Sequence, residues 1–107
     1  VMAMPTKLKV GHRTFSIRAI DAKERDEFGY AETDGFEGVI YINQSLRGTK
    51  LADAIMHEAL HAFNHVHGIT FGRDKDPEED AVNSSSGSVT TILADNSAFR
   101  KWWVSLF

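Results

Sequence analysis

The stretch TKLADAIMHEALHAFNHVHG, residues 49–68, decides the fold that we expect for this chain. Its apolar residues recur at spacings of three and four, the period of one face of an α-helix. This stripe consists of Leu51, Ile55, Ala59, Ala62 and Val66. Thr49 can cap the start of the helix, and Gly68 can end it because glycine readily adopts the left-handed conformation. Leu60 and Phe63 widen the stripe, so the sequence predicts a central helix that is covered on most sides.

The chain before this helix carries strand patterns. Residues 14–20 alternate apolar and polar side chains, as a half-buried strand does, and residues 7–10 make a shorter candidate. Asp34-Gly35 predicts a two-residue hairpin turn, because a type I′ turn needs positive φ at both central positions. The strands of this hairpin are expected at about 29–33 and 36–43. We therefore expect a small antiparallel sheet of three or four strands.

Two helices are expected after the central one. Pro77 suits the first position of a helix that Asp95 or Asn96 would break, and residues 98–106 form a last short helix. The Ser-rich residues 83–88 are poor helix material, and a flexible linker is the alternative there. The fold class is thus α+β in a single domain over residues 1–107. Residues 1–6 are expected to be disordered or left over from expression.

Composition limits the classes of function. The 107 residues are 42% hydrophobic and 25% charged, with a formal net charge of -3 and no basic block. Dedicated nucleic-acid and membrane-surface binders usually need clustered Lys and Arg, so neither partner is expected. The chain has no cysteine, so any metal would be held by nitrogen and oxygen ligands. No apolar run is long enough to span a membrane, and a cytoplasmic location is the default expectation.

The chemistry is concentrated in His57-Glu58-Ala-Leu-His61, an HExxH motif. Residues four apart lie one turn up on the same face of a helix, so two imidazoles there can converge on one zinc ion. Glu58 follows the first histidine and can reach the open coordination position as a general base and acid. The sequence therefore predicts Zn²⁺ on His57 and His61, with Glu58 as the catalytic residue.

Zinc requires a third protein ligand, and histidines are the first candidates. His65 lies eight residues beyond His57, or about 12 Å along the axis, which is too far to share the ion. His67 would complete HExxHxxNxxH, which differs from the metzincin pattern only in Asn64, where metzincins have glycine. That arrangement requires the chain to leave the helix near Asn64, whereas Gly68 offers a normal helix end after His67.

An acid on the following helix is the other candidate. Glu79 follows the same three and four spacing as Val82, Ser86 and Val89, so it would face the same partner as the apolar residues. Glu78 is feasible as well, and both acids also suit the positive end of a helix dipole. We favour Glu79.

A hairpin, an HExxH helix and a Glu-bearing helix together resemble the minimal zincin core of the gluzincin type. The chain is similar to ImmA/IrrE-like peptidases and to small metallopeptidases of phages and prophages, in which the HExxH helix is soon followed by an acidic helix start and a closing segment akin to TTILADNSAF. The likeness covers roughly residues 7–106, and HExxH is its specific part. It implies zinc on His57, His61 and Glu79, a peptide or protein substrate, and Glu58 as the acid and base.

Supporting residues and rival functions complete the expectations. Asp53 could orient His57 or serve as a first-turn acid, and Tyr30 and Tyr41 are expected to be packing or sheet-surface residues rather than oxyanion donors. Zincin substrates usually lie along a sheet edge, so strand 39–43 or its neighbour would bind the peptide. The rival functions are a catalytically weak zinc-binding regulatory protein and a metal-free domain. The oligomeric state stays open.

Overall fold

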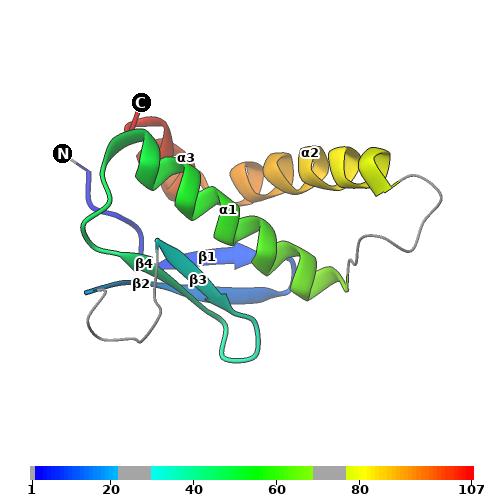
Figure 1. Ribbon diagram of the computed structural model, residues 1–107, viewed down its shortest axis with the longest axis horizontal. Coiled ribbons are helices and arrows are strands. Elements are labelled where there is room, and N and C mark those ends of the chain that lie inside the picture. Colours follow the sequence, from blue (N-terminus) through cyan, green and yellow to red (C-terminus); the bar gives the residue numbers. More distant parts are fainter. Residues whose placement is uncertain (1, 22–29, 69–76) are drawn as a thin grey trace.

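The computed structural model describes residues 2–21, 30–68 and 77–107, and for residues 77–84 it describes the backbone only. Within these residues, four strands are followed by three helices (Figure 1). The elements are β1 (Lys7–Val10), β2 (Arg13–Ile20), β3 (Ala31–Asp34), β4 (Val39–Asn43), α1 (Gly48–His67), α2 (Pro77–Asp95) and α3 (Ser97–Val104). The expected α+β class, with the HExxH motif on the first of three helices, is confirmed.

The sheet is mixed, which corrects the expectation of a purely antiparallel one. Its strand order is β1-β2-β4-β3, with antiparallel outer pairs and a parallel pair between β2 and β4. The chain passes from β2 to the edge position of β3, and the following hairpin returns β4 into the space beside β2. Strand β4 therefore lies inside the sheet, and among the described residues β3 is an edge strand that pairs with β4 alone.

The hairpin between β3 and β4 forms, but the predicted two-residue turn at Asp34-Gly35 is wrong. Residues 35–38 make a longer loop, and the positive φ of +75° belongs to Gly38. The Asp34 carboxylate accepts backbone hydrogen bonds from Phe36 at 3.1 Å and Glu37 at 3.0 Å, and the Asp34 carbonyl accepts one from Gly38 at 2.9 Å. An Asp side chain that bonds to the backbone after it stabilises such a loop, so the Asp-Gly pair acts here through the carboxylate.

Helix α1 spans the predicted stretch. It begins after Arg47 rather than with a Thr49 cap, and it ends at Gly68, which has a φ of +65° as expected. The middle of the predicted stripe is buried, with Ile55, Ala59 and Ala62 at 0% exposure, while Leu51 and Val66 at its ends are half-buried. The helix therefore lies against the sheet along most of its length.

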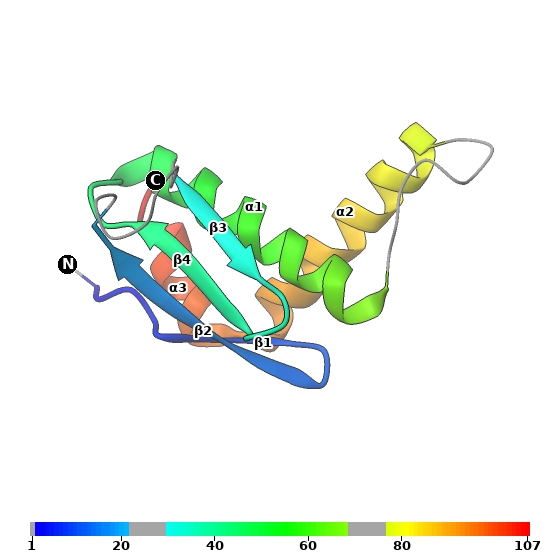
Figure 2. The same cartoon turned by 60° about the horizontal axis from the view of Figure 1, so that its bottom comes forward.

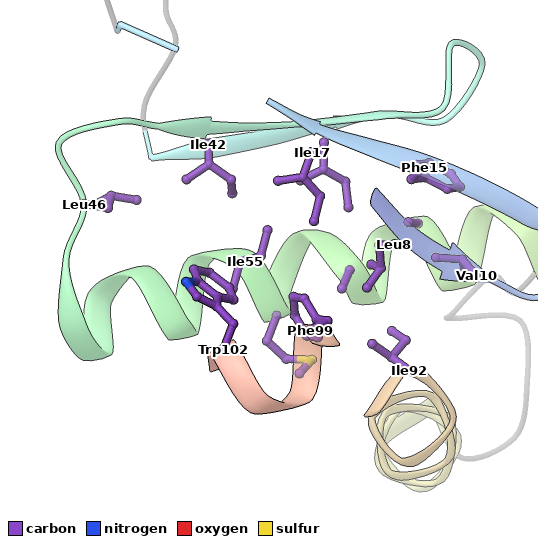
Figure 3. Close-up of a cluster of buried hydrophobic side chains, with 14 residues drawn as sticks. Leu8, Val10, Phe15, Ile17, Ile42, Leu46, Ile55, Ile92, Phe99 and Trp102 are labelled. Carbon is purple, nitrogen blue, oxygen red and sulfur yellow. The ribbon is translucent and has the colours of Figure 1, made fainter. Parts of the chain in front are cut away.

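All three helices lie on one face of the sheet (Figures 1 and 2). Side chains from the sheet point toward α1 (Figure 3). Ile92 of α2 and Phe99 and Trp102 of α3 reach the same core from the side opposite the sheet. The largest fully buried hydrophobic side chains are Phe15, Phe99, Leu8, Ile40, Ile42, Ile55, Ile92 and Val10. Trp102 is also buried, and Trp103 donates its indole N–H to the Ala52 carbonyl at 3.0 Å, so both act as packing residues, as predicted.

The segment before β1 and the junction between α2 and α3 are both tied to the sheet and the core. Met4 packs against it, and the Thr6 carbonyl accepts a hydrogen bond from Ile17 at 2.8 Å. Asn96 separates α2 from α3, and its side chain exchanges two hydrogen bonds with the backbone of Lys9 on β1. Helix α2 runs through the Ser-rich stretch, so the linker alternative is wrong. Within the described ranges, no helix is both long enough and apolar enough to cross a bilayer.

Candidate metal centre

His57, Glu58 and His61 form one cluster on α1. Each offers a ligand atom, and these atoms all lie within 4.8 Å of one another. The two imidazole Nε2 atoms are 3.0 Å apart, and the rings meet edge to face. Both histidines are exposed, whereas Glu58 is buried. The cluster can hold a metal ion that is approached from solvent.

The spacing of the two imidazoles suits zinc. A tetrahedral ion with Zn–N bonds of about 2.0–2.1 Å separates its two nitrogen ligands by about 3.3 Å. The observed separation of 3.0 Å differs by only a few tenths of an ångström, which small side-chain rotations can supply. The two imidazoles thus supply two of the three protein ligands that a catalytic zinc site usually has. The residues present therefore fit the metal that the motif implies.

Glu58 is buried on α1 and is bonded to a threonine of β3. Its position on α1, three residues after Ile55 and four before Ala62, places it at the border of the buried face, and only 7% of it is exposed. The Thr33 hydroxyl on β3 donates to Glu58 Oε1 at 2.8 Å and also lies 3.1 Å from the Glu58 carbonyl oxygen. A buried carboxylate needs such partners because it has lost most of its water.

The edge strand β3 runs beside the cluster in the same direction as α1 (Figures 1 and 2). A cavity of about 490 Å³ lies toward the start of α1, where Tyr30, Leu46 and Ala54 join His57 in its lining. A second cavity of about 420 Å³ lies toward the end of α1, where Gly35 and His65 join His61. Glu58 and Ala31 line both cavities. The cluster therefore sits between two hollows along one edge of the sheet.

The remaining histidines of α1 have other contacts. The helix continues through His67, whose Nδ1 lies 3.0 Å from the Phe63 carbonyl oxygen and whose ring stacks on Phe63. The metzincin arrangement requires the helix to end near Asn64, so the structure does not support it. His65 meets the ring of Phe36 edge to face at 5.6 Å, in keeping with its expected place outside the ion's reach.

Other predicted site residues divide into two groups. The side chains of Glu79 and Glu78 lie outside the described residues, and only their backbone position in the first turn of α2 is described. Asp53 is exposed and lines the cavity next to His57, but α1 starts five residues earlier, so it is not a first-turn acid. Tyr41 is buried in the sheet as expected, while Tyr30 is 67% exposed and lines the same cavity as Asp53.

Thr33 is the site residue that the sequence did not indicate. It lies 25 positions before Glu58 in a strand of four residues, and a single strand threonine carries no signal of its own. Only the packing of β3 against α1 brings the two together.

The chain matches no protein-family model, no curated protein and no solved structure. The site is therefore interpreted from the chemistry and geometry of its own residues on α1 and β3.

Proposed function

We propose that this protein is a small zinc-dependent peptidase of the zincin type, in which His57 and His61 hold the ion and Glu58 is the general base and acid. The observation that carries the proposal is the convergence of these three side chains within 4.8 Å, next to a sheet edge. Glu79 from α2 is the proposed third ligand, as the likeness to gluzincins implies.

The residues of the chain divide the work of hydrolysis. When bound, zinc lowers the pKa of a water to about 7 and polarises the carbonyl of the scissile bond. Thr33 engages Glu58 Oε1, so Oε2 is the oxygen that accepts the proton of the attacking water. Glu58 then passes this proton to the nitrogen of the leaving amine as the C–N bond breaks. The bond to Thr33 holds the partly enclosed Glu58 carboxylate in place between the two transfers.

The substrate that fits this arrangement is an extended peptide. An edge strand offers unpaired backbone groups, to which a peptide can add as a further strand. Of the two strands considered from the sequence, β4 is enclosed by β2 and β3, so β3 is the one that has an open edge in the part of the chain that the structure describes. The two cavities beside β3 would receive side chains from either side of the scissile bond.

The test compares Glu58→Gln with the unchanged protein. Protein stripped of metal and reloaded with zinc is incubated with a mixture of peptides of diverse sequence, and the products are identified by mass spectrometry. We expect Glu58→Gln to lower kcat by at least about 10²-fold, because general acid–base transfer contributes that much, while one zinc per chain is retained. Glu37→Gln, on an exposed loop glutamate, is the matched control and should keep full activity.

The same experiment separates the regulatory alternative from the peptidase. If Glu58→Gln loses zinc, then Glu58 is itself a ligand and the ion has a structural role. If the unchanged protein binds zinc but cleaves none of the peptides, the peptidase proposal is wrong and a zinc-binding interaction protein takes its place.

A further inference from the structure

The contact between Thr33 and Glu58 joins the edge strand to the motif helix. Strand pairing places Thr33 opposite Ile40, and the side chains of paired residues lie on the same face of a sheet. Ile40 is fully buried on the face that the helices cover, so Thr33 also points toward α1. Its hydroxyl reaches Glu58 Oε1 at 2.8 Å, which is a normal distance for an O–H donor to a carboxylate.

The position of Thr33 is set by the fold rather than by Glu58. Strand β3 is paired with β4 along its whole length, and the loop after it is packed against α1. A Cβ atom on Gly35 would lie 2.5 Å from His65 Nδ1. Because Gly35 has no side chain, the loop can lie this close to the His65 ring on α1. Arg13 also donates to the Gly35 carbonyl at 2.6 Å. The hydroxyl therefore presents a fixed donor to which the more flexible Glu58 side chain must adapt.

From this geometry we infer that Thr33 is the positioning residue for Glu58. It holds one carboxylate oxygen, and it thereby turns the other toward the place where His57 and His61 converge. The expected effect of Thr33 on kcat rests on the proposed function. Its effect on the orientation of the Glu58 carboxylate does not depend on whether the protein is a peptidase.

The experiment replaces Thr33 by Val, which keeps the branched shape and removes the hydroxyl, and by Ser, which keeps the hydroxyl. Residues that orient catalytic or metal-binding groups typically contribute about 10- to 100-fold, so we expect Thr33→Val to lower kcat by that factor. KM should stay within about threefold, because the lost interaction acts on the reacting groups and not on peptide binding. Thr33→Ser should restore most of kcat, and zinc content should be unchanged in both.

Thr14→Val provides the matched control, since Thr14 is an exposed threonine on β2 away from the cluster. It should behave like the unchanged protein. Unchanged kcat in Thr33→Val, or failure of Thr33→Ser to restore it, would overturn the inference. A loss of zinc in Thr33→Val would also overturn it, because the hydroxyl would then support the metal site as a whole.

Crystal structures of the zinc-loaded proteins supply the readout that does not depend on turnover. In Thr33→Val the Glu58 carboxylate should shift by about 1 Å or more, or occupy several rotamers, and in Thr33→Ser it should stay in place. If no peptide is cleaved by the unchanged protein, the proposed function fails and these structures alone decide the role of Thr33. A Glu58 carboxylate that keeps its position in Thr33→Val would show that Thr33 does not orient it.

Discussion

Zinc should raise the stability of the folded protein, and His61→Ala should remove most of that effect. The two imidazole nitrogens are already 3.0 Å apart, so we expect zinc to bind without rearrangement of the fold and its binding free energy to add to that of folding. At a free zinc concentration of 100 times Kd, the stabilisation is about 2.7 kcal/mol. For a domain of 107 residues, with about 4 °C per kcal/mol, this corresponds to a rise in Tm of about 10 °C.

Removing one imidazole leaves the ion with too few ligands. If Kd rises by about 100-fold, the same zinc concentration stabilises His61→Ala by only about 0.4 kcal/mol, and Tm moves by about 2 °C. Differential scanning calorimetry of metal-stripped protein, with and without added zinc, measures both shifts. His65→Ala is the control, because His65 is exposed on the same helix one turn further on.

His61→Ala and His65→Ala are expected to differ in how far added zinc raises Tm. His65→Ala should keep the full shift in Tm, since its ring contacts Phe36 and lies beyond the reach of the ion. A full zinc shift in His61→Ala would place the metal elsewhere. A lost shift in His65→Ala would mean that the ion is held one turn further along α1 than the cluster of His57, Glu58 and His61 indicates.

Three further predictions concern the third ligand and the fold. Glu79→Gln should weaken zinc binding by at least about 10-fold in isothermal titration calorimetry, and Glu78→Gln should leave it unchanged. Equal effects of the two substitutions would show that Glu79 is not the third ligand. Gly38→Ala should lower the free energy of unfolding by about 1–2 kcal/mol in urea titrations, because φ is +75° and the new Cβ would lie 2.9 Å from Arg13 Nη2. Trp103→Phe should cost about 0.5–1.5 kcal/mol through loss of the indole bond to the Ala52 carbonyl, and an unchanged urea midpoint would contradict that bond.

Periodic patterns in the sequence were enough to predict the helices and most strands. The stripe through Ile55, Ala59 and Ala62 is buried as expected, because the period of an α-helix puts those side chains on one face whatever they pack against. Gly68 ends α1 for an equally local reason, its left-handed conformation. Local chemistry was less decisive at Asp34-Gly35, where a carboxylate bond to the backbone gave a longer loop than the pair alone suggests.

The position of His57, Glu58 and His61 on one helix was determined by the sequence itself, since residues one and four apart have a fixed relation on a helix. Strand order was not, because pairing depends on which edges meet after the chain has folded, and the parallel contact of β2 with β4 has no local signal. Thr33 became a neighbour of Glu58 only through that arrangement. Short-range periodicity thus specified the candidate metal-binding residues, and the long-range packing of a strand edge against a helix decided what surrounds them.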